Sequence, residues 1–251
     1  MANNPKELRP ELIDINDLLK YFSKIMDKVK VFQVGANDGK TNDPIYEYIT
    51  KFEWEAILVE PQPDVFEREL KKNYRGFKNV NLVNAAIGNS NLPFYRLSFS
   101  DKRWATGLSS FDRKSLEEHI LSGYVDRMAQ KNGDILPPNK EEYISTIEVK
   151  MASFENLLEK YSFDNLDMLV IDTEGYDLMV LKQFNFDKIK PNLVLFESKN
   201  LSDQDFIQAK NLLIHHGYSL FWQKGDTVAI RFKYPFIRKI ISKIKAFLKK
   251  V

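Results

Sequence analysis

The chain has 251 residues, of which 43% are hydrophobic and 29% are charged, and it carries a net charge of +2. This composition is that of an ordinary globular domain with a substantial core, and it excludes a disordered or fibrous chain. The absence of cysteine excludes disulfides and thiolate metal ligands, and it favours a reducing compartment. The first residues lack the pattern of a secretory signal, and no apolar run approaches the roughly 20 residues that span a bilayer. We therefore expect a cytoplasmic protein.

The first predicted element is an amphipathic helix over residues 11–28. Its apolar residues recur at helical spacing: Leu12, Ile15, Leu18, Leu19, Phe22, Ile25 and Met26. We expect this helix to cover one face of a sheet.

The next segment, VFQVGANDG from Val31 to Gly39, is an apolar strand that ends in a loop with two glycines four residues apart. Such a loop exposes backbone N–H groups beside the start of a helix, and glycine allows a ligand to approach the backbone closely. The loop predicts a site for a nucleotide cofactor, although a turn of this kind also occurs in ordinary strand-to-helix connections.

The following strand, Ala56 to Glu60, ends in a carboxylate about 20 residues beyond the glycine loop, where an acid bonds the ribose of a bound nucleoside. A helix from Asp64 to Asn73 comes next. The third predicted strand runs from Val80 to Ile87 and contains the small residues Ala85 and Ala86, which suit the side of an adenine ring. This order of elements predicts half of a doubly wound α/β sheet.

The second half of the chain continues the alternation of strands and helices. An insertion over about residues 101–143 separates two further predicted strands, Pro93–Ser98 and Ser145–Met151. The remaining strands are predicted at Met168–Asp172, Leu193–Glu197, Tyr218–Trp222 and Thr227–Phe232, with helices at about 153–160, 176–183 and 202–214.

Five segments, in this order and spacing, resemble the FkbM-type S-adenosylmethionine-dependent methyltransferases: VFQVGANDG, ILVEPQPDVFEREL, VNLVNAAIG, LDMLVIDTEGYDLMVL and LVLFE. The resemblance covers about residues 29–199. It implies a class I methyltransferase fold, with a doubly wound, mostly parallel, Rossmann-like sheet. It also implies S-adenosylmethionine as cofactor and methyl transfer to a hydroxyl of a sugar, glycan or related metabolite. The chain then divides into a helical cap (1–28), a methyltransferase domain (29–233) and a tail (234–251).

The resemblance also implies which residues bind the cofactor. Its amino-acid end would lie on the glycine loop, its ribose on Glu60, its adenine beside the third strand and its methyl group near Asp172. The full set is Gln33, Gly35, Ala36, Asn37, Asp38, Gly39, Glu60, Asn84, Ala85, Ala86 and Asp172. Two positions depart from the family pattern. Gln33 replaces an acid that contacts the cofactor's ammonium, and Lys199 replaces a histidine that many relatives carry after the LVLFE strand.

Catalysis is expected where the strand that begins at Val31 meets the strand Met168–Asp172, because ligands of open α/β sheets bind at the carboxyl ends of the strands. Methyl transfer to a hydroxyl requires positioning and removal of a proton, which a carboxylate can accept. Asp172 and Glu174 are therefore the candidate bases. In the alternative interpretation, Asp172 bonds backbone and Glu174 caps a helix that begins near Gly175.

Acceptor recognition is assigned to the insertion and to Lys199, which follows the predicted strand Leu193–Glu197. The candidates are Arg103, Trp104, Ser109, Ser110 and Lys199, with Trp104 as a stacking platform or, alternatively, as a plug packed on the core. The chain's histidines, His119, His215 and His216, have no spacing that indicates a metal, and we predict no metal site.

Other functions fit this sequence less well. A nicotinamide-dependent reductase would share the loop and Glu60, but the Tyr74-x-x-x-Lys78 pair precedes the third strand and cannot reach the crevice. A nucleic-acid methyltransferase is disfavoured for two reasons. The strand that begins at Met168 leads into DTEG, where the amino-group methylases carry a base-stacking motif, and the body of the chain is acidic. A catalytically silent membrane- or glycan-binding protein on the same fold is the remaining alternative.

The tail differs in charge from the rest of the chain. Residues 231–251 contain eight basic and no acidic residues, so residues 1–230 carry a net charge of −6. After Pro235, apolar residues recur at steps of three and four: Phe236, Ile237, Ile240, Ile241, Ile244, Phe247, Leu248 and Val251. Such a basic amphipathic helix suits an anionic membrane surface, here the inner face of the membrane, through residues 235–251. In the alternative, it docks on the domain with a solvated lysine face.

Overall fold

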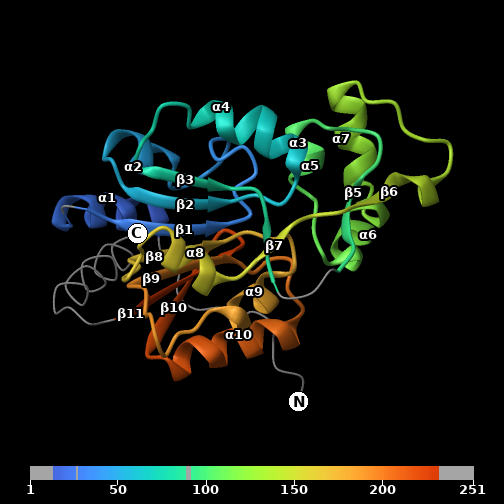
Figure 1. Ribbon diagram of the computed structural model, residues 1–251. Helices are drawn as coiled ribbons and strands as arrows, with labels where there is room; N and C mark the ends of the chain where they lie inside the picture. Colours follow the sequence, from blue (N-terminus) through green and yellow to red (C-terminus); the bar gives the residue numbers. More distant parts are fainter. Residues whose placement is uncertain (1–13, 27, 89–91, 232–251) are drawn as a thin grey trace, which may run out of the picture.

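The computed structural model describes residues 14–26, 28–88 and 92–231 (Figure 1). The predicted basic tail and the first residues of the predicted leading helix lie outside these ranges. Within them, no helix is long and apolar enough to cross a membrane.

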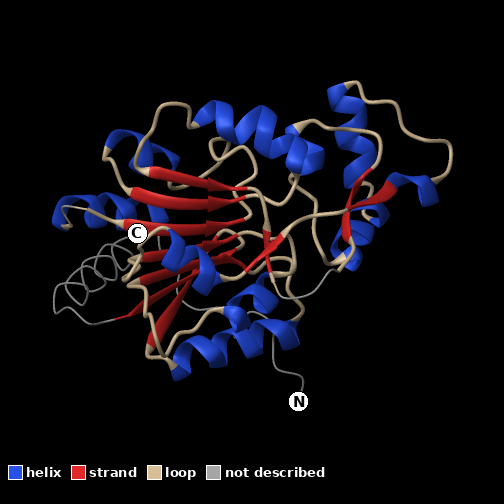
Figure 2. Cartoon of the chain, in the orientation of Figure 1, coloured by secondary structure: helices blue, strands red, loops and turns tan. Residues whose placement is uncertain are grey.

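The centre of the molecule is a seven-stranded sheet in the order β3-β2-β1-β8-β9-β11-β10 (Figure 2). Its strands from β3 to β9 pair in parallel, whereas β11 is antiparallel to both of its neighbours. The bounds are β1 Lys30–Val34, β2 Glu55–Val59, β3 Val80–Val83, β8 Met168–Ile171, β9 Leu193–Glu197, β10 Tyr218–Gln223 and β11 Asp226–Arg231. The order turns in both directions from β1, so the predicted doubly wound, mostly parallel sheet is confirmed.

Helices cover both faces of this sheet, because the strands are apolar on both sides. The strand residues on one face of the sheet, Val31 among them, pack against α1 (Ile15–Ile25), α2 (Tyr46–Lys51) and the helical segment 63–73. The strand residues on the other face, Phe32 among them, pack against α8 (Phe154–Lys160), α9 (Asp177–Gln183) and α10 (Asp203–His215). Each face therefore has its own hydrophobic core.

Two predicted helices differ in detail. The leading helix ends at Ile25 and not at residue 28, because Met26 is an extended C-cap whose N–H bonds the Phe22 carbonyl. The helix predicted over 64–73 is one helical run that begins at Pro63. It contains a π-helical turn, η2 (Phe66–Leu70), between α3 (Pro63–Val65) and α4 (Lys71–Asn73).

The predicted third strand, residues 80–87, is wrong as a single element. It breaks after β3 at Asn84, whose side chain donates to the carbonyls of Glu60 (2.9 Å) and Pro61 (3.1 Å). The chain then forms β4 (Ala86–Ile87), which pairs with β7 (Met151–Ala152) in a small separate sheet. The strand predicted over 145–151 is also split, into β6 (Ile144–Ile147) and β7, because β7 pairs with β4 and β6 pairs with another strand.

The insertion lies beyond the carboxyl ends of the parallel strands (Figure 1). It is framed by the antiparallel pair β5 (Phe94–Leu97) and β6. Between these strands lie α5 (Arg103–Thr106), α6 (Arg113–Leu121), α7 (Tyr124–Asn132) and η3 (Lys140–Tyr143). These elements share a small hydrophobic core of their own, which includes Leu97, Leu116 and Val125. The insertion is thus a packed unit placed over the edge of the sheet where ligands bind.

Candidate active site

The glycine loop after β1 passes directly over the end of β8. Gly35 has a φ of +81°, and a Cβ there would lie 1.8 Å from the carbonyl oxygen of Asp172. The N–H groups of Gly35 and Ala36 both donate to the Val59 carbonyl at 3.0 Å. Only glycine allows this close approach of two backbones, so the loop and Asp172 are held side by side.

The loop is tied to the end of β2 by a buried carboxylate. Asn37 adopts a φ of +47°, and its N–H donates to Glu60 Oε2 at 2.8 Å. Glu60 Oε1 accepts from the N–H (2.9 Å) and the side-chain amide (3.2 Å) of Gln62. Burial raises the pKa of Glu60 to about 7, against these hydrogen bonds, which lower it. Since a carboxylate has about four lone-pair sites, Glu60 retains capacity for a further donor.

The insertion is fastened to the segments that follow β2 and β8 by hydrogen bonds. The Gln62 amide donates to the Thr106 carbonyl at 3.0 Å, and Ser109 Oγ donates to Gln62 Oε1 at 3.0 Å. Ser110 Oγ donates to the carbonyl of Thr173 at 2.8 Å. These bonds hold α5 and the segment that follows it across the cleft from the glycine loop.

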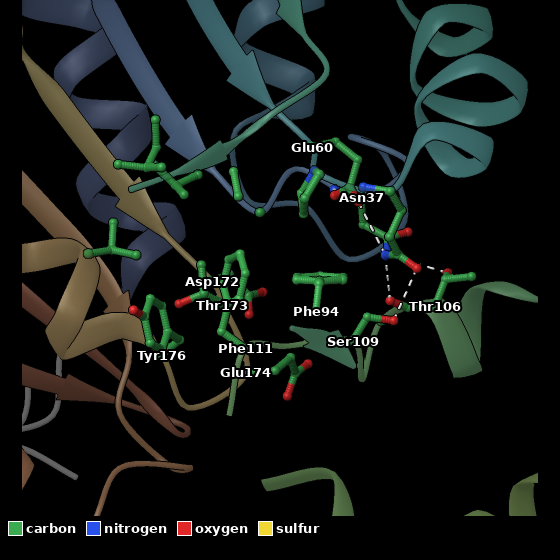
Figure 3. Close-up of a pocket in the computed structure, with 18 of the residues that line it drawn as sticks. Asn37, Glu60, Phe94, Thr106, Ser109, Phe111, Asp172, Thr173, Glu174 and Tyr176 are labelled. Carbon is green, nitrogen blue, oxygen red and sulfur yellow. Dashed lines mark hydrogen bonds between the residues drawn. The ribbon is translucent and has the colours of Figure 1, made fainter. Parts of the chain in front are cut away.

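Two adjoining cavities open between the sheet edge and the insertion. The first lies between Glu60, the insertion and α9, and Phe94, Phe111 and Tyr176 contribute aromatic walls (Figure 3). The second lies between the loop before α2 and the ends of β8, β9 and β11. Both are lined by Gly35, Arg103 and Asp172. Asp172 therefore stands at the junction of the two spaces.

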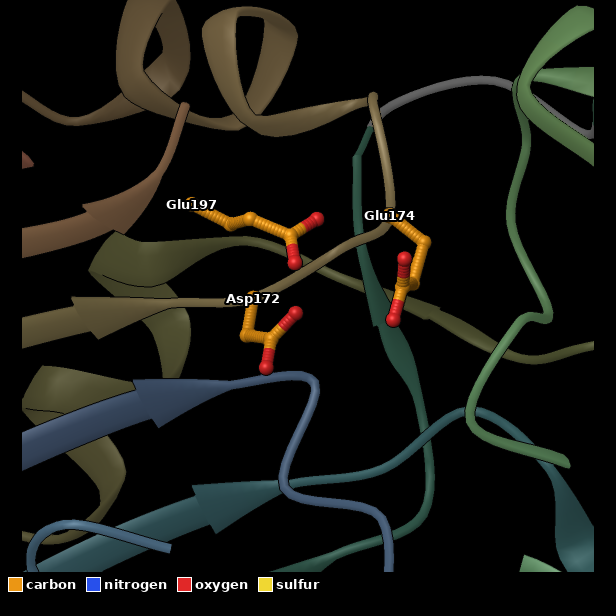
Figure 4. Close-up of side chains that lie close together, drawn as sticks. All are labelled: Asp172, Glu174 and Glu197. Carbon is orange, nitrogen blue, oxygen red and sulfur yellow. The ribbon is translucent and has the colours of Figure 1, made fainter. Parts of the chain in front are cut away.

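Three carboxylates converge at this junction. One oxygen from each of Asp172, Glu174 and Glu197 lies within 4.8 Å of the others (Figure 4). Glu174 (φ +51°) is turned back toward the cleft by the bend after β8. The fully buried Asp177 holds this bend, since its Oδ2 accepts from Thr173 Oγ1 at 2.9 Å and its Oδ1 accepts from the N–H of Glu197 at 3.2 Å.

Two members of the cluster have raised pKa values. Solvent reaches Asp172 through the cavities, but protein surrounds its other sides, and this burial together with the charge of Glu197 raises its pKa to about 7. Burial and the neighbouring carboxylates also raise the pKa of Glu174. Asp172 thus lies in the range where a side chain can exchange a proton near neutral pH.

The structure brings only part of the sequence-predicted residues to the cavities. The first cavity is lined by Gly35, Asn37, Glu60, Ala86, Arg103, Ser109, Asp172 and Glu174. The second is lined by Gln33, Gly35, Ala36, Arg103 and Asp172. The others, Asp38, Gly39, Asn84, Ala85, Trp104, Ser110 and Lys199, lie outside the lining of both.

Those outlying residues have structural contacts. Asp38 Oδ1 accepts from the N–H groups of Lys40 and Thr41, and a Cβ on Gly39 would meet the side chains of Leu70 and Tyr74. Trp104 packs near Phe99 in the core of the insertion and donates to Asp134 at 2.9 Å.

The alternative role considered for Glu174, as a helix cap, is wrong. The helix α9 begins at Asp177, and its N-cap is Tyr176 without a side-chain cap bond. The carboxylate of Glu174 instead accepts from the Asn200 amide at 2.7 Å.

Sequence reasoning missed several residues of the site. Gln33, at the position where an acid was expected, donates to Asp43 Oδ2 at 2.8 Å, and Asp43 Oδ1 accepts from the N–H groups of Ile45 and Tyr46. The Asp-Pro pair before α2 was a signal for a turn at Asp43. Gln62 lies two residues after Glu60, whereas Asn200 had no local signal.

The family model described as the methyltransferase FkbM domain matches residues 33–220. The chain belongs to the FkbM methyltransferase family. Membership in this family supports S-adenosylmethionine-dependent methyl transfer, and the sheet described above agrees with a class I methyltransferase fold. No curated protein matches the sequence significantly.

Several solved structures are similar at low identity. The methyltransferase FkbM of Methylobacillus flagellatus KT is 12% identical with a TM-score of 0.48, over 90% of this chain and 50% of that one. A precorrin-6y C5,15-methyltransferase of Geobacter metallireducens GS-15 is 12% identical with a TM-score of 0.42, over 86% and 87%. An RNA methyltransferase of Salinibacter ruber, in complex with S-adenosyl-L-homocysteine, is 9% identical with a TM-score of 0.40, over 88% and 93%.

The residues present fit the cofactor that the family implies. Glu60 offers a buried acceptor for a hydroxyl, and Asn37 Oδ1 is a buried acceptor without a partner among the described residues. Hydroxyl and amino groups, which a nucleoside with an amino-acid end carries, are the donors that these acceptors lack.

We expect Glu60→Ala to weaken S-adenosylmethionine binding by about 1–3 kcal/mol, because ribose hydroxyls would lose their acceptor. Protonation of Glu60 removes an acceptor site, so the affinity of the wild type should fall as the pH drops below about 7. Calorimetric titration with the cofactor and with its demethylated product measures both effects. The exposed Glu69→Ala is the control, and equal affinities in the two variants would contradict the assignment of Glu60.

Proposed function

We propose that this FkbM-family protein transfers the methyl group of S-adenosylmethionine to a hydroxyl of a sugar, glycan or related metabolite. The observation that carries the proposal is the place of Asp172, whose carboxylate lies at the junction of two cavities and has a pKa of about 7. The first cavity, which Glu60, Asn37 and the insertion line, is then available to the nucleoside and the acceptor, and the second cavity meets it at Asp172.

S-adenosylmethionine supplies a methyl group on a sulfonium, and transfer forms a bond from the acceptor oxygen to the methyl carbon while the carbon–sulfur bond breaks. The acceptor hydroxyl must lose its proton in this step, and a carboxylate with a pKa near 7 is a suitable base at neutral pH. Asp172 takes this proton in the proposed mechanism. Its carboxylate has no hydrogen bond to any residue in the described part of the chain, so it is free to approach the acceptor.

The walls of the cleft support a polar acceptor with a hydroxyl. Ser109 and Thr106 place polar groups in the first cavity, and Arg103 reaches both cavities. Aromatic side chains of Phe111 and Tyr176, whose ring centroids are 5.2 Å apart, offer an apolar surface of the kind that sugar faces contact. These features favour a small polyhydroxylated acceptor over a large apolar one.

The test is an assay of methyl transfer from S-adenosylmethionine to a panel of sugars, nucleotide sugars and glycan fragments. Formation of the demethylated cofactor measures the transfer. Mass spectrometry and NMR of the product should locate the new methyl group on an oxygen. A methylated nitrogen or carbon would overturn the proposal of O-methylation. Cofactor binding without transfer to any of these acceptors would favour the alternative, a catalytically silent binding protein.

A further inference from the structure

When Asp172, Glu174 and Glu197 are ionised, their carboxylates bring three negative charges close together at the methyl-transfer junction. Such a cluster is stable only if nearby cations or hydrogen-bond donors balance it, and a divalent metal ion is the usual partner of three oxygen ligands of this kind. The contacts of the segment that follows β9 show which cation is already there.

The segment after β9 is fixed to the turn between β10 and β11. Ser198 donates to the carbonyl of Gly225 from its N–H (2.9 Å) and from its Oγ (3.1 Å), and Thr227 Oγ1 donates to Ser198 Oγ at 2.9 Å. The stem of Lys199 lies over Gly225, where an added Cβ would be 3.3 Å from Lys199 Cδ. The backbone and the neighbouring glycine therefore fix the path of this lysine side chain.

The end of that side chain reaches the cluster. Lys199 Nζ forms an ion pair with Oε1 of Glu197, whose side chain is 5% exposed. Burial alone would lower the pKa of Lys199, but the charges of Glu174, Glu197 and Asp172 outweigh it and raise the pKa, so the ammonium stays charged. Lys199 thus supplies a permanent positive charge beside all three carboxylates.

A neighbouring amide completes the arrangement. The Nδ2 group of Asn200 donates to Glu174 Oε2 at 2.7 Å and to Glu197 Oε2 at 2.8 Å. Two of the three carboxylates are therefore held by Lys199 and Asn200, whereas Asp172 has neither contact. Glu174 and Glu197 are therefore fixed in place, whereas the carboxylate of Asp172 is not.

We propose that the ammonium of Lys199 is the resident cation of this cluster and occupies the role that a divalent metal ion would otherwise take. Lys199 and Asn200 are positioning residues that fix Glu197 and Glu174 and leave Asp172 free. The consequence for Asp172 as base rests on the proposed function, whereas the identity of the cation does not.

The test is a titration of the full chain with Mn²⁺ at pH 8, with free Mn²⁺ followed by electron paramagnetic resonance. The wild type should show no stoichiometric binding. Lys199→Met leaves three carboxylates without their cation, so it should bind one Mn²⁺ at least about tenfold more tightly, a change of about 1.4 kcal/mol. Lys199→Arg keeps the charge and should behave as the wild type. Lys224→Met, on the adjacent turn and exposed, is the charge-matched control and should also bind no Mn²⁺.

A second variant identifies the ligands. Combining Lys199→Met with Glu197→Gln should abolish the new Mn²⁺ binding, and Mn²⁺ should raise the melting temperature of Lys199→Met alone. Stoichiometric Mn²⁺ binding by the wild type would overturn the proposal, even if Lys199→Met does not fold. A folded Lys199→Met that binds Mn²⁺ no better than the wild type would overturn it as well. Because these readouts need no acceptor, they are independent of whether O-methylation is observed.

Discussion

Asp172→Asn should lower the rate of methyl transfer by about 100-fold or more, because an amide cannot accept the acceptor's proton. The affinity for S-adenosylmethionine should be almost unchanged, since Gly35 contacts the backbone carbonyl of Asp172 and the substitution preserves it. In the wild type the rate should fall as the pH drops below about 7, where Asp172 becomes protonated. Single-turnover rates over a pH series, together with calorimetry, measure all three effects.

The same substitution, which lowers the rate, should raise the stability of the folded protein. The pKa of Asp172 is higher in the folded protein than its ordinary value, so ionisation of this carboxylate favours the unfolded chain. This destabilisation is absent well below the ordinary pKa of an aspartate and is complete above about pH 7. Asp172→Asn should therefore be more stable than the wild type at pH 8, and the difference should shrink toward pH 4.

A suitable control is Asp164→Asn, on an exposed residue that precedes β8, whereas Asp172 follows it. It should change neither the rate nor the pH profile. If Asp172→Asn turns over as fast as this control, Asp172 is not the base, and Glu174 becomes the group to examine.

The central sheet could be predicted because its strands are short apolar runs that end in polar or glycine residues. β9 has the predicted bounds, Leu193–Glu197. The prediction for residues 80–87 was wrong because local apolar character cannot show which strand a segment pairs with. Asn84 bonds carbonyls of the β2 end, and Ala86 donates to the Lys150 carbonyl at 2.7 Å, far along the sequence. Such pairing is decided by tertiary contacts.

The site was predictable where it follows the sheet and not where it depends on the insertion. Gly35, Glu60 and Asp172 each follow a strand of the central sheet, and parallel strands bring their carboxyl ends to one edge. The contacts of Gln62 with Thr106 and Ser109, by contrast, cross between segments that share no periodic pattern. For Trp104 the sequence left two interpretations open, a platform for the acceptor or a plug, and in the structure it packs against the local core of the insertion, as the second describes.

The remaining strong expectation concerns Gly35, where two backbones meet. Gly35→Ala introduces a Cβ 1.8 Å from the Asp172 carbonyl oxygen and also strains a residue with a φ of +81°. The left-handed conformation costs about 1–2 kcal/mol for a residue with a side chain. Forcing β1 and β8 apart adds about 1–3 kcal/mol, the usual cost of overpacking. Unfolding by denaturant should show the combined loss, and calorimetry should show no binding of S-adenosylmethionine, because the loop and Asp172 can no longer lie side by side.

Gly76→Ala separates the two contributions. Gly76 has a similar φ of +88°, but a Cβ there would meet nothing within 4 Å. This variant should therefore lose only the part of the stability that comes from backbone strain, and it should bind S-adenosylmethionine as the wild type does. If Gly35→Ala is no less stable than Gly76→Ala and still binds the cofactor, the contact between the glycine loop and the end of β8 does not control the site. The clash with the Asp172 carbonyl predicts the contrary, because neither partner is a side chain that can rotate away.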